Sequence, residues 1–340
     1  MKKKSGIFLS TLALSAYLCG CGEAGPVAAA GSAADAGEGH LKVVTTIYPE
    51  YDWVCNILGE QAADAELTML LDNGVDLHSY QPSAKDIMTI SSCDVFVYVG
   101  GESDSWVKDA LAGAENKDMI VIDLMEALGD AVKEEEIVEG MEAEEEHDHE
   151  EEEHDHEEEE EVEYDEHVWL SLKNAEILCD VIADGLAQAD PANAEQYRAN
   201  AEGYVAELAA LDAEYQSVVD AAANNTLLFA DRFPFRYMTE DYGLEYYAAF
   251  VGCSAETEAS FETVMFLAEK TDELGLQTIL KIEGSDGKLA DTIKASTTGK
   301  DQQILTMNSL QSVTTKDAGE GTTYLSVMRD NLEVLKQALQ

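Results

Sequence analysis

The sequence predicts an α/β fold in which two βα lobes with parallel sheets are joined by one long rigid helix. Short runs of β-branched and aliphatic residues alternate with helix-like segments in both halves of the chain, and such alternation is typical of parallel strands covered by helices. Between the halves, apolar side chains recur at spacings of mostly three and four residues, which places them on one face of a helix.

The first half contains four predicted strands. Gly59 ends the first predicted helix, and Ser83 is a predicted N-cap because its side-chain oxygen can accept a hydrogen bond from the first helical turn. The strands are predicted at residues 41–47, 67–71, 94–99 and 119–124, and the helices at residues 52–58, 83–90 and 106–111.

The linking helix is predicted to begin near Asp190 and Pro191, because proline is favoured in the first helical turn. Its apolar face runs from Tyr197 to Val219. A helix unbroken over residues 193–222 would be about 45 Å long, at a rise of ~1.5 Å per residue. Such a helix can connect two lobes stiffly.

The second half repeats the alternation of strands and helices. We divide the folded part into an N-terminal lobe (residues 41–170), a connecting helical segment (171–225) and a C-terminal lobe (226–340). The strands of the second half are predicted at residues 226–230, 245–250, 278–282 and 303–307, and its helices at 235–241, 261–274, 288–297 and 324–338.

The first 40 residues form a predicted targeting segment and tether. Three lysines precede an apolar run, residues 7–18, which is too short to span a bilayer stably. The run ends in L-C-G-C, which resembles the lipobox of bacterial lipoproteins. We expect residues 1–20 to be a signal peptide, Cys21 to carry the lipid, and residues 21–40 to be a flexible tether. An ordinary signal peptide that contains cysteines is the alternative.

Composition limits the partners. The 340 residues carry a net charge of −50, from 20 basic and 70 acidic residues, which argues against nucleic acid and anionic lipid surfaces. Outside the targeting segment four cysteines lie far apart, with no C-x-x-C pair, so they form neither a disulfide framework nor a zinc ribbon. Buried free thiols are expected, with one disulfide as the alternative. These cysteines are Cys55, Cys93, Cys179 and Cys253.

An acidic segment of 33 residues, 134–166, interrupts the first lobe. It holds 22 Asp or Glu and four histidines but no Lys or Arg. Imidazole and carboxylate groups at this density can bind a divalent cation such as Zn²⁺, and the charge predicts a mobile loop. A solvating acidic linker is the alternative. The candidate loop ligands are His147, His149, His154 and His156.

Further candidate ligands follow predicted strands. In open α/β sheets, ligands bind beyond the carboxyl ends of the strands. His78 follows the second strand, His167 follows the acidic segment, and Asp231 and Glu283 each come directly after a strand of the second half, with Asp286 close behind. Two imidazoles with carboxylates in a cleft can bind a divalent metal.

Five stretches of the chain carry a family resemblance. Over residues 41–340 the sequence resembles the cluster A-I substrate-binding proteins, the metal receptors of bacterial ABC importers for zinc and manganese. The stretches are T-T-I-Y-P-E-Y-D-W-V (45–54), G-V-D-L-H-S-Y-Q-P-S (74–83), Y-D-E-H-V-W-L-S (164–171), D-P-A-N-A-E-Q-Y (190–197) and Y-L-S-V-M-R-D-N-L-E (324–333).

The resemblance implies a metal cleft between the lobes, in which His78 and His167 match two first-lobe ligands. The family's third ligand lies in a motif like F-H-D-A-F, but here the stretch is F-A-D-R-F and the matching residue is Ala230. A carboxylate, a cysteine, a water or a loop histidine must replace it, and Asp231 is the first choice. Glu283 matches the fourth ligand. Outside candidates on another loop are Cys253, Glu256 and Glu258.

The resemblance further implies an extracytoplasmic, lipid-anchored, monomeric protein that delivers a divalent metal to an ABC permease in the membrane. Zn²⁺ is the expected metal because of the histidine-rich segment, and Mn²⁺ is the alternative because histidines with carboxylates form a harder ligand set. An extracellular adhesin or a zinc buffer is a rival function. We expect no enzymatic activity, because the sequence contains no H-E-x-x-H motif or comparable nucleophile motif.

Overall fold

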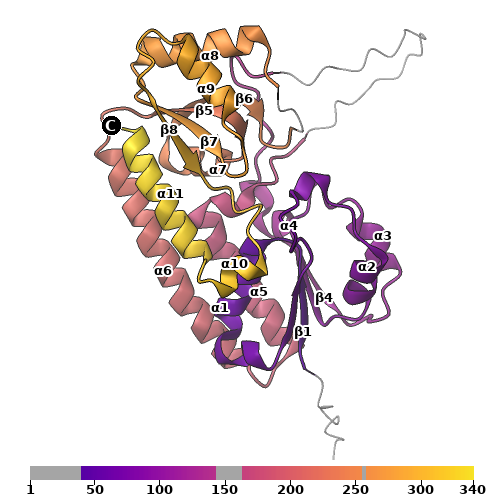
Figure 1. The fold of residues 1–340 in the computed structure, drawn as a ribbon. Coiled ribbons are helices and arrows are strands. Elements are labelled where there is room, and N and C mark those ends of the chain that lie inside the picture. Colours follow the sequence, from indigo (N-terminus) through magenta and orange to yellow (C-terminus); the bar gives the residue numbers. More distant parts are fainter. Residues whose placement is uncertain (1–39, 143–162, 255–257) are drawn as a thin grey trace, which may run out of the picture. The chain divides into compact units, whose positions relative to one another are not determined.

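A computed structural model describes residues 40–142, 163–254 and 258–340, all within the unit His40–Gln340. Two four-stranded sheets organise it, in the orders β2-β1-β3-β4 and β6-β5-β7-β8. All strand pairs are parallel, which confirms the predicted fold class (Figure 1). The strands are β1 (Lys42–Thr45), β2 (Glu66–Met69), β3 (Val95–Tyr98), β4 (Ile120–Asp123), β5 (Thr226–Phe233), β6 (Glu245–Val251), β7 (Thr278–Ile282) and β8 (Gln303–Met307).

Helices connect the strands of each sheet. Ser83 is the N-cap of α2, and its Oγ accepts a hydrogen bond from the backbone N–H of Asp86. Gly59 ends α1 with a φ of 58°, a conformation that favours glycine. The helices are α1 (Tyr48–Leu58), α2 (Ala84–Ser91), α3 (Val107–Ala112), α4 (Leu124–Leu128), α5 (Leu172–Ala189), α6 (Ala194–Asp220), α7 (Arg236–Tyr242), α8 (Phe261–Leu274), α9 (Lys288–Ser296), α10 (Thr315–Gly319) and α11 (Tyr324–Ala338).

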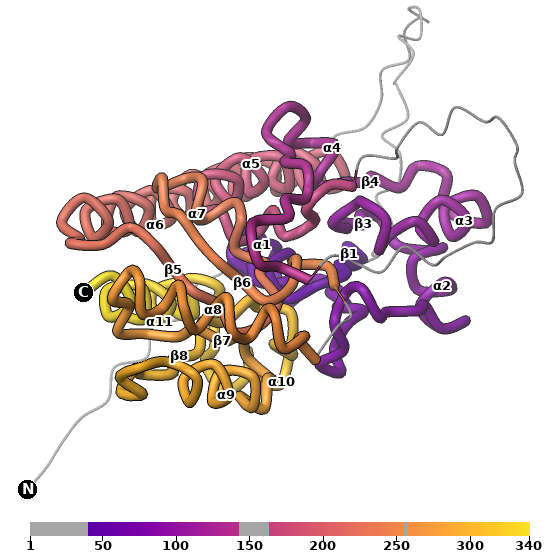
Figure 2. The backbone as a smooth tube through the Cα atoms, turned by 90° about the horizontal axis from the view of Figure 1, so that it is seen from above, coloured from indigo at the N-terminus to yellow at the C-terminus, as the bar shows by residue number. Residues whose placement is uncertain are grey.

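The predicted linking helix is α6, whose 27 residues span about 40 Å at ~1.5 Å per residue. It does not stand alone, because α5 packs along it (Figures 1 and 2). The apolar stripe read from the sequence is its buried face, formed by Tyr197, Ala201, Tyr204, Leu208, Leu211 and Tyr215.

Buried side chains from both halves form one continuous apolar core. Two hydrogen bonds within it join distant segments of the chain. Trp169 donates through Nε1 to the carbonyl of Ser309 at 2.8 Å, and the hydroxyl of Tyr324 donates to the carbonyl of Trp169 at 2.6 Å. The short helical turn that directly follows His167 is thereby fixed to the second half of the chain.

Strand β5 is longer than predicted. We expected it to end at residue 230, but it continues to Phe233, and its pairing with β6 shifts register between Phe229 and Arg232. Asp231 therefore lies inside the strand, at this irregularity, and does not follow the strand.

Several predictions from the sequence lie outside the described residues. These are the signal peptide, the lipid-bearing Cys21, residues 21–39 of the tether, the outside candidate Glu256, and the loop ligands His147, His149, His154 and His156. Within the described part of the chain, no helix is long and apolar enough to cross a membrane. The four cysteines Cys55, Cys93, Cys179 and Cys253 are free thiols, of which Cys93 and Cys179 are buried.

The Tyr324 hydrogen bond should contribute measurably to stability. Tyr324→Phe removes the donor to a buried carbonyl, which we expect to lower the free energy of unfolding by about 1–3 kcal/mol. Urea denaturation measures the change. The exposed Tyr164 provides the control, and Tyr164→Phe should change stability by less than about 0.5 kcal/mol. Equal effects of the two substitutions would contradict a structural role for the Trp169–Tyr324 contact.

Candidate metal site

His78 lies in a single 3₁₀ turn, Leu77–Ser79, that follows strand β2. The carboxylate of Asp76 caps this turn by accepting a hydrogen bond from the His78 backbone N–H at 3.1 Å. The ring is largely buried, and its Nδ1 lies 2.9 Å from Ser103 Oγ and 3.4 Å from Glu166 Oε2. The position of the ring is therefore fixed by groups on two other segments.

His167 is fully buried and directly precedes the 3₁₀ turn Val168–Leu170. Asp165 holds it twice: one carboxylate oxygen accepts the His167 backbone N–H at 2.8 Å and lies 3.0 Å from ring Nδ1. Because a carboxylate can only accept, Nδ1 must carry the proton in this contact. The remaining ring nitrogen, Nε2, is the one that can bind a metal ion, and it lies 3.1 Å from the side-chain amide of Gln311.

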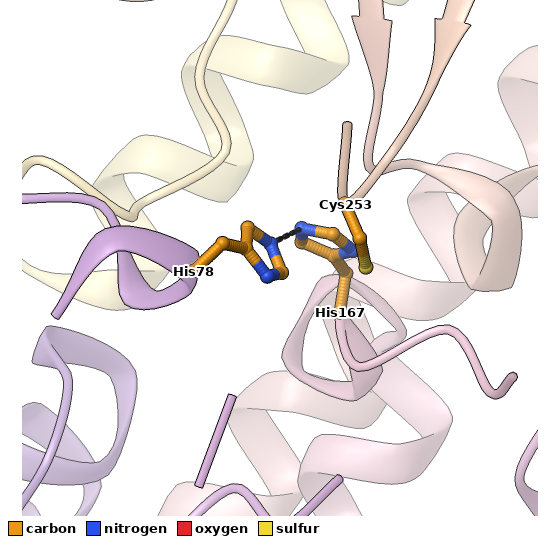
Figure 3. A group of neighbouring side chains, drawn as sticks. All are labelled: His78, His167 and Cys253. Atoms are coloured by element: carbon orange, nitrogen blue, oxygen red, sulfur yellow. Dashed lines mark hydrogen bonds between the residues drawn. The ribbon is translucent and has the colours of Figure 1, made fainter. Parts of the chain in front are cut away.

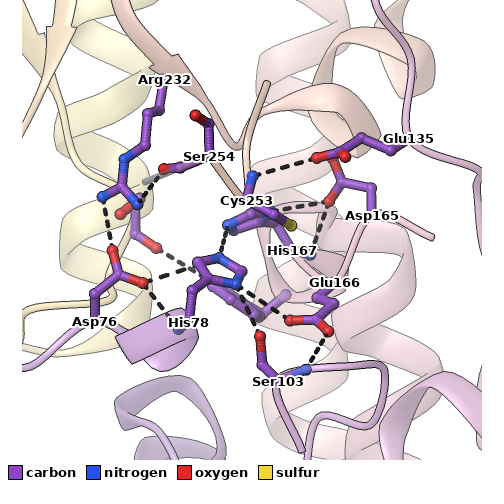
Figure 4. A network of polar contacts seen from close by, with 12 residues as sticks. Asp76, His78, Ser103, Glu135, Asp165, Glu166, His167, Arg232, Cys253 and Ser254 are labelled. Atoms are coloured by element: carbon purple, nitrogen blue, oxygen red, sulfur yellow. Dashed lines mark hydrogen bonds and ion pairs between the residues drawn. The ribbon is translucent and has the colours of Figure 1, made fainter. Parts of the chain in front are cut away.

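The Nε2 atoms of His78 and His167 face each other at 3.2 Å (Figures 3 and 4). In each ring Nδ1 lies beside a carboxylate, Glu166 for His78 and Asp165 for His167. Carboxylates in this position orient metal-ligating histidines and increase their basicity. A single cation bound by both Nε2 atoms would join the two rings.

A third potential ligand is Cys253, which follows strand β6. One ligand atom from each of His78, His167 and Cys253 lies within 4.8 Å of the other two (Figure 3). No other group of this kind occurs among the described residues. The sequence placed Cys253 only among the outside candidates. Its position three residues after a predicted strand, residues 245–250, was the signal that could have ranked it higher.

Gly252 allows this approach. A Cβ atom at this position would lie 3.0 Å from His167 Cε1 and 3.0 Å from the carbonyl oxygen of Phe233, closer than side chains normally approach. The His167 ring therefore packs directly against the backbone that leads into Cys253.

The predicted second-lobe carboxylates are engaged elsewhere. Asp231 accepts hydrogen bonds from the backbone N–H groups of Arg232 and Ile282, at 3.0 and 3.3 Å. Glu283 accepts from the backbone N–H and the hydroxyl of Ser309, at 2.7 and 2.6 Å. Neither carboxylate belongs to the three-residue group around His167, and their role as ligands stays a prediction.

An ion pair beside the histidines joins the two halves of the chain. Arg232 of β5 donates to Asp76 Oδ2 at 2.6 Å (Figure 4). Burial opposes ionisation of Asp76, but the Arg232 guanidinium and His78 outweigh it and hold the pKa of this carboxyl below its usual range. Asp76 therefore stays charged next to His78 and ties the His78 turn to the second sheet.

An acidic cavity of about 270 Å³ opens onto His78 and Cys253. One of its glutamates, Glu163, directly follows the undescribed residues 143–162, and its carbonyl accepts a hydrogen bond at 2.9 Å from the backbone N–H of a second, Glu135. Such a cavity attracts cations. It is lined by His78, Glu102, Ser103, Glu135, Glu163, Tyr164, Glu166 and Cys253.

The surroundings have opposite effects on two groups that line this cavity. Burial opposes ionisation of Glu166, but hydrogen bonds from His78 and Ser103 outweigh it and lower its pKa. For the Cys253 thiol, burial raises the pKa, and the nearby carboxylates of Asp165, Glu135 and Glu166 raise it further. Without a bound metal the thiol is therefore neutral.

A known protein family matches almost the whole folded part of the chain. Residues 43–338 match the family model described as "ZnuA: Zinc-uptake complex component A periplasmic". The chain belongs to this family. The resemblance to metal-binding substrate-binding proteins that was read from the sequence is thereby confirmed.

Two relatives within the family are 30% identical to this chain over their aligned residues. The high-affinity zinc uptake system protein ZnuA of Bacillus subtilis is 30% identical over 99% of this chain and 98% of its own length. The zinc-binding protein AdcA of Streptococcus pyogenes is 30% identical over 88% of this chain but only 56% of AdcA. The chain thus spans about half the length of AdcA.

A solved structure of the family has the same fold. The Zn(II)-bound ZnuA-like domain of Streptococcus pneumoniae AdcA aligns with a TM-score of 0.67 and 28% identity, over 88% of this chain and 99% of that domain. The two-lobed architecture is therefore shared with a member of the family whose structure contains zinc.

Gly252 should be needed for the position of the His167 ring. Gly252→Ala would push the ring away, and we expect Zn²⁺ affinity to fall by about 10–100-fold, as when a metal-ligating histidine loses its orienting partner. Calorimetric titration measures this. The control is Gly203→Ala, where a Cβ meets nothing within 4 Å. Unchanged Zn²⁺ affinity in Gly252→Ala would contradict the importance of this packing.

Proposed function

We propose that this chain is the substrate-binding protein of an ABC zinc importer, and that it captures Zn²⁺ between His78 and His167. The observation that carries the proposal is the facing pair of imidazoles, with Nε2 atoms 3.2 Å apart and a carboxylate beside each Nδ1. Two nitrogen ligands of one zinc ion, at Zn–N distances of ~2.0–2.1 Å, lie about 3.4 Å apart in a tetrahedral site. The pair is thus spaced for one ion.

Zinc fits the described ligands better than manganese does. Imidazole suits zinc, whereas manganese prefers carboxylate, carbonyl and water ligands. The three-residue group contains two imidazoles and a thiol but no carboxylate, and the family description and the relatives named above refer to zinc. Mn²⁺ remains the alternative cargo that a competition titration tests.

The proposal also covers where the protein is located and where it delivers Zn²⁺. The family description refers to a zinc-uptake complex and a periplasmic component, which supports an extracytoplasmic receptor that carries its metal to a membrane permease without catalysing a reaction. A related AdcA of Streptococcus pneumoniae is called a lipoprotein. We propose the same anchoring here, through Cys21, with the protein acting as a monomer.

A graded mutant series tests the site. We expect Asp165→Asn to weaken Zn²⁺ binding by about 10–100-fold, because it removes the charged partner of Nδ1. His167→Ala and His78→Ala remove ligands and should weaken binding more. Calorimetry on the full chain measures each affinity, with the exposed His40→Ala as control. Tight binding that survives His167→Ala would refute the proposed site.

Deleting the acidic segment separates the receptor from a zinc buffer. A variant that lacks residues 143–162 loses all four loop histidines. We expect it to bind fewer ions in total but to keep one tight Zn²⁺ site that depends on His78. If deletion abolishes tight binding, the acidic segment is the functional element and the chain acts as a buffer.

A further inference from the structure

The second sheet must supply a ligand if the metal is to be held from both halves of the chain. The sequence nominated Asp231 and Glu283, but each is hydrogen-bonded to its own surroundings. Asp231 is held by backbone N–H groups of β5 and β7, and Glu283 is held by Ser309. Ala230, which stands where the family resemblance places a histidine, is buried in an apolar cluster.

Among the described His, Cys, Asp and Glu residues of the second half, Cys253 is the one that groups with the two histidines. Strand β6, which it follows, pairs with β5 in the sheet, so Cys253 lies on the strand next to the one that carries Ala230. Its backbone N–H donates to Glu135 Oε1 at 3.3 Å (Figure 4). The small residue before it, Gly252, lets this segment touch the His167 ring.

The separations are close to those of a zinc site. In a tetrahedral site with Zn–N ~2.0–2.1 Å and Zn–S ~2.3 Å, nitrogen and sulfur ligands lie about 3.6 Å apart. The ligand atoms of His78, His167 and Cys253 lie within 4.8 Å of one another, so a shift of about 1 Å or less brings them to ligand distance.

We propose that the Cys253 thiolate is the second-half metal ligand, which makes the centre a His₂Cys site in place of a site completed by histidine or carboxylate. This inference rests on the proposed function, since it concerns the same ion. Binding transfers the thiol proton to solvent as the S–Zn bond forms. The fourth position remains open to an oxygen ligand.

A thiolate ligand also determines which metals the site accepts. Soft sulfur ligands favour Zn²⁺ over Mn²⁺, which prefers oxygen. We therefore expect Cys253→Asp to narrow the preference for Zn²⁺ over Mn²⁺ at least tenfold compared with the unmodified chain. Unchanged relative affinities would count against direct coordination by sulfur.

Cobalt provides a spectroscopic test. Co²⁺ bound to the full chain should show an intense thiolate-to-cobalt charge-transfer band, which Cys253→Ser should abolish. Cys55→Ser is the matched control, because Cys55 is also a partly exposed free thiol, and it should keep the band. A band that is absent from the unmodified chain, or that persists in Cys253→Ser, overturns the proposal.

Alkylation gives a second test that requires no variant. Because the raised pKa leaves little thiolate, labelling of Cys253 in metal-free protein requires prolonged treatment with iodoacetamide at alkaline pH. Saturating Zn²⁺ should suppress that labelling at least tenfold while labelling of Cys55 stays unchanged. Equal labelling with and without zinc contradicts the inference.

The two proposals can fail separately. If Zn²⁺ binds tightly and depends on His167, but no charge-transfer band or protection appears, the receptor function stands and the Cys253 ligand is wrong. If tight binding is independent of both histidines, the proposed function itself fails.

Discussion

The site depends on one constraint: two imidazoles are held with their Nε2 atoms 3.2 Å apart in a largely buried position. Asp165 and Glu166, consecutive in sequence, each stand beside the Nδ1 of a different ring. A single short segment therefore orients both rings, so that both Nε2 atoms can bind one metal ion with little rearrangement of the rings.

Contacts with the second half of the chain fix the two segments that carry His78 and His167. The turn after His167 is fixed by Trp169 to Ser309 and by Tyr324 to Trp169, while Arg232 holds the His78 turn through Asp76. These contacts join residues more than a hundred positions apart. The histidines, although both precede residue 170, are therefore held partly by the second half of the chain, and the shared core limits how far the halves can separate.

Sequence reasoning predicted the regular elements well where hydrophobic pattern and capping residues agree. The observed β7, β8, α8 and α11 have the predicted bounds, and His78 lies in the loop after β2, as expected. The predicted end of β5, at residue 230, was wrong, because the strand continues through Asp231 with a shift in its register against β6. The proximity of Cys253 to His167 depends on the lateral order of β5 and β6 and on the space at Gly252, which residue spacing alone does not specify.

X-ray absorption at the zinc edge would identify the ligands of the bound ion. For the full chain loaded with one equivalent of Zn²⁺, we expect scattering from two imidazole rings together with one sulfur neighbour. In His167→Ala one imidazole should be lost. A zinc environment of several imidazoles and carboxylate oxygens, unchanged in His167→Ala, would refute the site at His78 and His167, because it would place the ion in the acidic segment.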